Sequence, residues 1–127
     1  EIIRALNPTA PIVLTLSPVP LMATFRDISC LTADCVSKSV LRVALDQVMS
    51  TKPANVYYWP SFEIVKWVGA NLPWAAYGRK GEARAIDRPL VRQIMDEFVE
   101  AFYTPDARTI IRSRAAEAPE DDSESED

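Results

Sequence analysis

Pro11-Ile12-Val13-Leu14-Thr15-Leu16-Ser17-Pro18-Val19-Pro20 is the stretch that decides the fold. Its apolar run over 12–16 is nearly continuous, which favours a strand buried on both faces, as in a parallel sheet covered by helices. The prolines that follow remove two backbone donors and fix φ, so the strand leaves the sheet there. Because ligands bind outside the carboxyl ends of strands in open α/β sheets, we expect residues 17–24 to form a pocket wall.

Helical and extended patterns alternate outward from this strand. Apolar residues at 2, 3 and 6 predict the end of a helix, which Pro8 terminates. A valine repeat predicts a helix over 34–50, with Thr32 or Asp34 as its N-terminal cap. Residues 55–59 are rich in β-forming side chains and predict a second strand.

The second half of the chain reads as helix, loop and helix. Residues 61–68 have a short amphipathic spacing. Residues 69–86 hold all three glycines and predict a long loop, a feature that is usually functional or mobile. The clearest helix covers 87–103, with Asp87 as its cap, whereas residues 104–116 are polar and read as irregular.

Strands that alternate with helices predict an α/β fold with a parallel sheet. Two strands alone are marginally stable in water, and the strand at 12–16 needs neighbours on both sides. We therefore expect only part of the sheet here, with the true N-terminus upstream of Glu1. The predicted division is a C-terminal portion of a larger domain over 1–103 and an acidic disordered tail over 104–127.

Charge is unevenly distributed along the chain. Residues 117–127 hold seven of the 18 acidic residues, and the rest carry 14 basic and 11 acidic residues, a net charge of +3. We read the tail as a solvated terminus, with a partner-binding tail as the alternative. No apolar run approaches the roughly 20 residues that span a bilayer, and no signal peptide is visible, so we expect a cytoplasmic protein without membrane contact.

The two cysteines, Cys30 and Cys35, have the spacing C-x4-C. The chain has no histidine and no third cysteine, so we expect neither a metal site nor a cofactor. A redox pair more typically has the spacing C-x-x-C. We interpret both cysteines as small, at least half-buried side chains in a reducing compartment.

Four segments together resemble the C-terminal half of the GSCFA domain. They are VLTLSPVPL at 13–21 followed by Ala23-Thr24, SKSVLR at 37–42, YYWPSFEIV at 57–65, and Arg84-Ala85-Ile86. The resemblance covers residues 3–103, and the order and spacing of the segments make it specific. This family is similar to the GDSL/SGNH hydrolases. The resemblance therefore implies a flavodoxin-like three-layer α/β/α fold and an ester hydrolase or acyl-transfer activity on an ester or acetylated carbohydrate.

The same resemblance implies a catalytic machinery that this chain lacks. In SGNH enzymes a serine near the start of the domain is the nucleophile, and a histidine near its end is the base. The segment with the nucleophile is not present, Ala85 stands where the histidine is expected, and Glu82 stands where its aspartate partner is expected. Because no histidine exists anywhere in the chain, we expect it to be inactive as given.

The candidate pocket-lining residues are Ser17, Pro18, Thr24, Lys38, Glu63 and Arg84. Ser17 fits a turn or a pocket wall better than a nucleophile, since no base is near it in sequence. Lys38 and Ser39 are adjacent on a helix and point about 100° apart, which disfavours a Ser-Lys catalytic pair. Glu63 either caps its own short helix, which we favour, or accepts a hydrogen bond in the cleft.

A rival function is a non-catalytic binding or assembly module that uses the 69–86 loop or the acidic tail. The basic and aromatic residues around this loop have the composition that stacks bases and neutralises phosphates. They are Arg79, Lys80, Arg84 and Arg88, with Trp74 and Tyr77. The acidic tail would compete with such binding, so nucleic acid is disfavoured as a partner. A third interpretation is a fragment without independent function.

Overall fold

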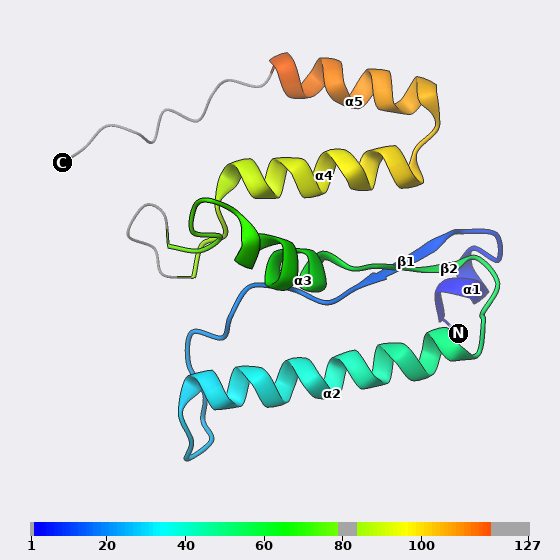
Figure 1. Cartoon of the computed structure of the whole chain (residues 1–127). Helices are drawn as coiled ribbons and strands as arrows, with labels where there is room; N and C mark the ends of the chain where they lie inside the picture. Colours follow the sequence, from blue (N-terminus) through cyan, green and yellow to red (C-terminus); the bar gives the residue numbers. More distant parts are fainter. Residues whose placement is uncertain (1, 79–83, 118–127) are drawn as a thin grey trace. The chain divides into compact units, whose positions relative to one another are not determined.

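The computed structural model describes residues 2–78 and 84–117. The chain divides into two compact units, residues 1–91 and residues 92–127. The first unit holds the sheet and its connections, and the second holds most of one helix and the helix that follows it (Figure 1).

The first unit is built on a two-stranded parallel sheet. Strands β1 (Ile12–Thr15) and β2 (Val56–Trp59) pair from Ile12 opposite Val56 to Thr15 opposite Trp59. Their β-branched and aromatic side chains favour the extended backbone. The prediction of an α/β arrangement with a parallel pair is confirmed.

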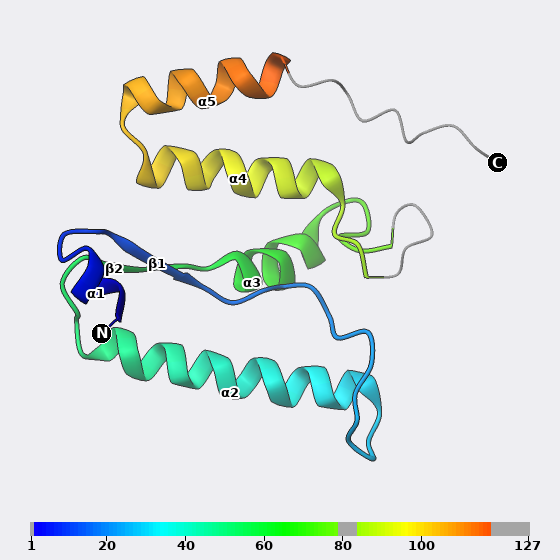
Figure 2. The same cartoon turned by 180° about the vertical axis from the view of Figure 1, so that it is seen from behind.

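Helix α2 (Cys30–Ser50) connects the two strands and runs alongside the sheet (Figures 1 and 2). A parallel pair requires a crossover of this kind. The helix begins at Cys30 because Ser29 is its cap, accepting a hydrogen bond from the Thr32 amide at 3.1 Å. The predicted caps Thr32 and Asp34 were wrong, since both residues lie inside the helix.

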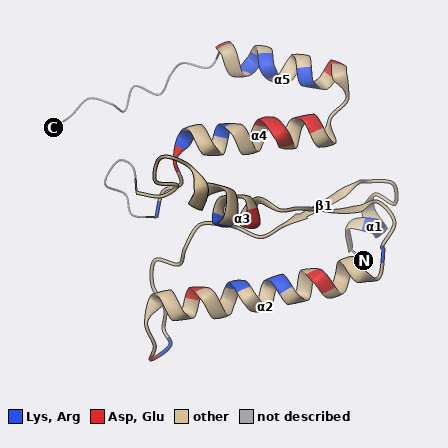
Figure 3. Cartoon of the chain, viewed as in Figure 1, with Lys and Arg blue, Asp and Glu red and all other residues tan. Residues whose placement is uncertain are grey.

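Charged residues recur at every fourth position of α2, in the order Asp34, Lys38, Arg42 and Asp46. Lys38 Nζ lies 4.0 Å from Asp34, and the Arg42 guanidinium lies 3.5 Å from Asp46. Figure 3 shows two basic positions between two acidic ones along the helix. Because residues four apart share one helix face, Lys38 and Arg42 lie at the middle of a single charged stripe.

Three short helical segments follow β2 without a break. They are α3 (Ser61–Glu63), the π-helix η1 (Ile64–Val68) and the 3₁₀ helix η2 (Gly69–Asn71). The helix predicted over 61–68 therefore continues into the predicted loop. An isolated antiparallel bridge joins Tyr77 to Ile86 farther along. Single π-helical turns are frequent at functional sites, so η1 is a candidate part of a site.

Arg4, in helix α1 (Ile2–Leu6), joins the two turns that precede the strands. Its guanidinium donates to the carbonyls of Pro8 at 2.9 Å and Ala10 at 2.8 Å. It also donates to Ala54 at 2.6 Å and Asn55 at 3.2 Å. One side chain thus satisfies four backbone acceptors at the amino end of the sheet.

The buried apolar residues of the first unit gather on segments that follow the strands. Val65 is 1% exposed and Leu90 is 2% exposed. Leu16, directly after β1, and Ala76 are also buried. Ala33, on the helix that joins the strands, is buried as well at 2% exposed.

The second unit contains most of α4 (Arg88–Phe102) and all of α5 (Pro105–Glu117). Glu100 of α4 accepts hydrogen bonds from Arg108 and from Arg112, the latter at 3.1 Å. The prediction of an irregular segment over 104–116 was wrong, because a proline in the first turn and these ion pairs favour a helix. The acidic stretch after residue 117 lies outside the described residues. Within the described part of the chain, no helix has the length and apolarity to cross a membrane.

Candidate functional site

Residues 17–21, which follow β1 and Leu16, are held by side chains from distant parts of the chain. Tyr77 donates its hydroxyl to the Pro18 carbonyl at 3.0 Å, and Lys38 Nζ donates to the Val19 carbonyl at 2.9 Å. Arg84 donates two bonds to the Pro20 carbonyl, at 2.9 and 2.7 Å. Each of these carbonyls is thereby bound by a side chain.

Leu21 completes this arrangement. Its carbonyl accepts a bond from the Cys30 thiol at 3.3 Å, and its amide donates to Asp34 Oδ1 at 2.9 Å. The two prolines cannot donate to a neighbouring strand, so side chains take over the role of a sheet partner. The segment at the carboxyl end of β1 is thus held by side-chain hydrogen bonds.

The predicted site residues divide between this segment and other places. Ser17 Oγ accepts the Val19 amide at 3.3 Å, as a turn-forming serine does, and Thr24 Oγ1 accepts the Arg26 amide at 3.1 Å. Lys38 and Arg84 bind the 17–21 segment, of which Pro18 is part. Within the described ranges, the bond of the Thr24 side chain is this local one to Arg26.

Glu63 lies in a second polar cluster that links α2 to β2 and α3. Its carboxylate accepts a hydrogen bond from Arg42 Nε at 2.7 Å and from the Tyr58 hydroxyl at 2.8 Å. The Arg42 guanidinium also lies 5.0 Å from the centre of the Tyr58 ring. The favoured capping role was wrong, because α3 has no side-chain cap and the Glu63 carboxylate binds these two partners instead.

The two clusters shift the pKa of their tyrosines upward. Burial, followed by the hydrogen bond and charge of Glu63, raises the pKa of Tyr58 to about 12. Burial first, and then the charge of Asp34, raises the pKa of Tyr77. Both phenols are therefore neutral donors at physiological pH and act as structural hydrogen-bond donors.

Hydroxyl groups also meet where the two strands end. Ser61 Oγ donates to the Leu16 carbonyl at 3.0 Å, and Thr15 Oγ1 donates to the Trp59 carbonyl at 2.9 Å. The two hydroxyl oxygens lie 2.7 Å apart. Since both groups bond to backbone carbonyls, neither is presented as an activated nucleophile.

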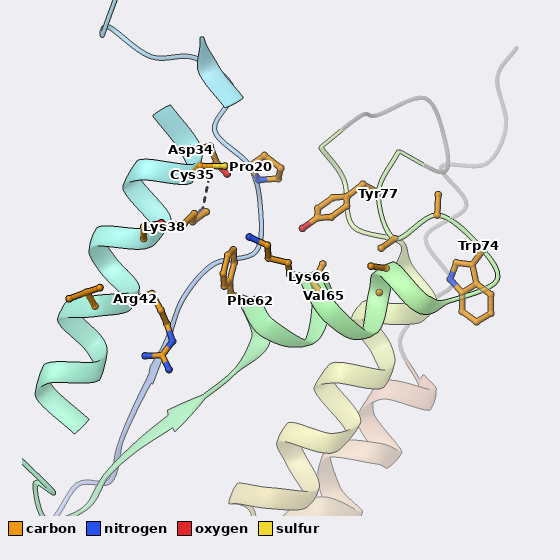
Figure 4. A pocket seen from close by; sticks show the side chains of 16 residues that line it. Pro20, Asp34, Cys35, Lys38, Arg42, Phe62, Val65, Lys66, Trp74 and Tyr77 are labelled. Atoms are coloured by element: carbon orange, nitrogen blue, oxygen red, sulfur yellow. Dashed lines mark ion pairs between the residues drawn. The ribbon is translucent and has the colours of Figure 1, made fainter. Parts of the chain in front are cut away.

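A cavity of about 790 Å³ lies between α2, the η1 region and residues 74–77 (Figure 4). Asp34, Lys38 and Arg42 line it from α2. Phe62 and Lys66 line it from the opposite wall. This volume is within the usual range for small-molecule sites.

Several of these cavity-lining residues were not predicted from the sequence. Phe62, Val65 and Lys66 share the spacing i, i+3 and i+4, so the amphipathic pattern over 61–68 carried the signal for this wall. The bond from Tyr77 to Pro18 joins residues 59 positions apart and has no local signature. Ser17, Pro18, Thr24, Glu63 and Arg84 are not among the cavity-lining residues, whereas Lys38 is.

The position expected for a base has no catalytic group. Ala85 is exposed, and its carbonyl accepts the Gly78 amide at 3.0 Å. Glu82, the expected aspartate position, lies outside the described residues. Over the described ranges, no group of three or more His, Cys, Asp or Glu side chains is placed to hold a metal ion.

The sequence also matches the model of a known protein family. The model of the GSCFA family matches residues 1–106. The chain belongs to the GSCFA family. No curated protein and no solved structure matches it significantly.

The segments that carry the GSCFA resemblance are also the ones that bond to one another. The SPVP segment at 17–20 receives its bonds from Lys38 of SKSVLR and from Arg84. Arg42 of SKSVLR binds Glu63 of YYWPSFEIV. In this GSCFA domain the four segments therefore build one contiguous polar framework beside the cavity.

Proposed function

We propose that this GSCFA chain forms the ligand-binding wall, and not the acid–base machinery, of an ester hydrolase or acyl-transfer domain. The observation that supports it is the position of the cavity beside the 17–21 segment, which leaves the carboxyl end of β1. Ligands of open parallel sheets bind at this end. Lys38 and Tyr77 each bind the segment and line the cavity, so the wall is held in a fixed shape.

The proposed substrate is an ester or an acetylated carbohydrate, and this class comes from the family. The proposal includes a flavodoxin-like three-layer α/β/α fold. This chain contributes β1 and β2 to its central sheet. A wall that combines Phe62, Trp74 and Tyr77 with polar groups suits a molecule with both apolar and hydrogen-bonding faces.

The chemistry of the described residues argues against turnover. The chain has no histidine, and the methyl group of Ala85 cannot accept a proton. Lys38 is bonded to the Val19 carbonyl and faces Asp34, so it is not placed as a base for a serine. Inactivity of the chain is therefore part of the proposal.

A direct test measures hydrolysis of p-nitrophenyl acetate and binding of an acetylated xylo-oligosaccharide. We expect the hydrolysis rate of buffer alone, together with saturable oligosaccharide binding that shifts the NMR signals of residues lining the cavity. Turnover by the chain that is lost on changing Ser17 or Ser61 to Ala would refute the inactive wall.

Two tryptophan variants locate the binding. Val43 lines the cavity and Val48 does not, although both lie on α2 and both are exposed. Val43→Trp fills the cavity and should abolish oligosaccharide binding, whereas Val48→Trp should leave it unchanged. Equal effects of the two variants would place the ligand elsewhere.

The rival function is a non-catalytic binding or assembly module that uses the 69–86 loop or the acidic tail, and the two functions differ in what precedes the chain in the gene. A Gly-Ser-Cys-Phe-Ala-like segment in the upstream coding sequence would favour the hydrolase-derived domain. A complete unrelated domain there would favour the module.

A further inference from the structure

More cationic than anionic side chains line the cavity. Lys38, Arg42 and Lys66 are cationic, and Asp34 is the carboxylate among the lining residues. Lys38 is bound to the Val19 carbonyl and lies 4.0 Å from Asp34. The charge of Lys38 is thus offset within the cavity wall.

Arg42 is also satisfied within the protein. Its Nε lies 2.7 Å from Glu63, and its guanidinium extends along the charged stripe of α2 to Asp46 at 3.5 Å. Two carboxylates of the protein therefore offset the charge of Arg42.

Lys66 differs from Lys38 and Arg42 in its surroundings. Its ammonium lies 5.3 Å from the centre of the Phe62 ring, and no carboxylate of the described residues lies within ion-pair distance. Figure 4 shows the ammonium extended from η1 into the space that faces α2. Among the described residues, Lys66 is therefore the cavity-lining cation that no carboxylate neutralises.

The surfaces next to Lys66 are apolar or aromatic. Phe62 and Val65 belong to the same wall, and Val43 and the Tyr77 ring line the cavity as well. Lys66 and Phe62 come from the segment where the backbone widens from α3 into the π-helix. An ammonium beside an aromatic ring favours a ligand with an anionic group and a planar or apolar body.

We infer that the cavity binds a small organic carboxylate of single charge, with its acid group on Lys66 and its apolar body against Phe62 and Val43. This inference rests on the proposed function, because it takes the same cavity as the ligand site. It adds the charge of the ligand, which the family does not give. An ester or carbohydrate carrying a carboxylate would satisfy both proposals.

The test compares two probes of equal shape, 1-naphthylacetate and 1-naphthylacetamide, by NMR titration of the full chain. We expect the carboxylate to bind about fivefold more tightly than the amide, the range of one solvent-accessible ion pair. The difference should shrink as the salt concentration rises from 0.05 to roughly 0.5 M.

Variants of Lys66 separate charge from shape. Lys66→Gln should make the two probes bind equally, and Lys66→Arg should keep the preference for the carboxylate. Lys52→Gln removes the same charge at an exposed position that does not line the cavity, so it should leave the preference intact. Lys66 is exposed, and a far-UV spectrum and melting curve confirm that each variant is folded.

The outcomes distinguish the two proposals. Equal binding of acid and amide to the unmodified chain, or a preference that survives Lys66→Gln, overturns the carboxylate inference and leaves the proposed wall standing. Failure of both probes to shift the signals of the cavity residues, with no oligosaccharide binding, overturns the wall as well.

Discussion

At the scale of single residues, Gly69 shows how closely the η1 region approaches the loop after it. A Cβ placed on Gly69 would lie 2.9 Å from the Ala76 Cβ and 3.4 Å from Leu90 Cδ2. The Gly69 φ of -58° is ordinary for a helix, so the requirement for glycine is one of space. The Ala76 methyl has no rotamer to move into, so the backbone must shift instead.

We predict that Gly69→Ala lowers the free energy of unfolding by about 1–3 kcal/mol, the usual cost of overpacking. Urea unfolding followed by circular dichroism measures the change. The double variant Gly69→Ala with Ala76→Gly removes the clashing methyl and should recover most of the loss. A double variant that is no more stable than Gly69→Ala alone would contradict this explanation.

Tyr58 gives a prediction for alkaline pH. Its pKa is raised from 10.0 to about 12 in the folded chain. Between these values the unfolded chain loses the phenol proton while the folded chain keeps it, so stability falls as pH rises from 10 to 12. In Tyr58→Phe this part of the fall should disappear, as measured by urea unfolding at several pH values.

The variant Glu63→Gln tests how far Glu63 raises the pKa of Tyr58. The hydrogen bond and charge of Glu63 both raise the pKa of Tyr58, but burial is the largest cause. The variant should therefore lower the pKa of Tyr58 without returning it to 10.0, as read from the ultraviolet absorbance of tyrosinate. A pKa that does not change would exclude Glu63 as a cause.

At the scale of elements, the 17–21 segment depends on side chains rather than on a neighbouring strand. We predict that Arg84→Met, which removes both donors to Pro20, makes the Leu21 amide exchange about tenfold faster, because charged hydrogen bonds contribute about 1.5–3 kcal/mol. Hydrogen exchange by NMR measures it. Arg26→Met is the control, since no side-chain bond of Arg26 reaches this segment. Equal exchange in both variants would show that the segment is held without Arg84.

The elements themselves were largely predictable, but their contacts were not. The apolar run at 12–16 and the β-formers at 55–59 gave both strands, because strand propensity and proline boundaries are local signals. Helix α5 was missed because its polar composition outweighed Thr104-Pro105, a local helix-start signal. The pairing of Lys38 with the Val19 carbonyl depends on the crossover through α2 and has no local signal.

At the scale of the whole molecule, burial is limited. Among the described residues seven apolar side chains are buried, whereas Leu31 is 78% exposed and Val40 is 63% exposed on α2. A parallel pair of strands without further neighbours is marginally stable. The sequence-based expectation that the sheet needs additional strands stays a prediction.

We predict that the chain alone has a free energy of unfolding below about 5 kcal/mol, the lower end for natural domains. Urea unfolding should give a shallow transition, because little apolar surface becomes newly exposed. A steep transition with an unfolding free energy well above this value would show that the exposed side chains are covered, for example by a second copy.

Tyr77 both lines the cavity and donates a hydrogen bond to the Pro18 carbonyl. Any occupant that rotates its ring must break that bond, and an occupant that leaves the ring in place must keep it. For an occupant that moves the ring, ligand affinity and the hydrogen bond to the Pro18 carbonyl are therefore thermodynamically linked through one phenol.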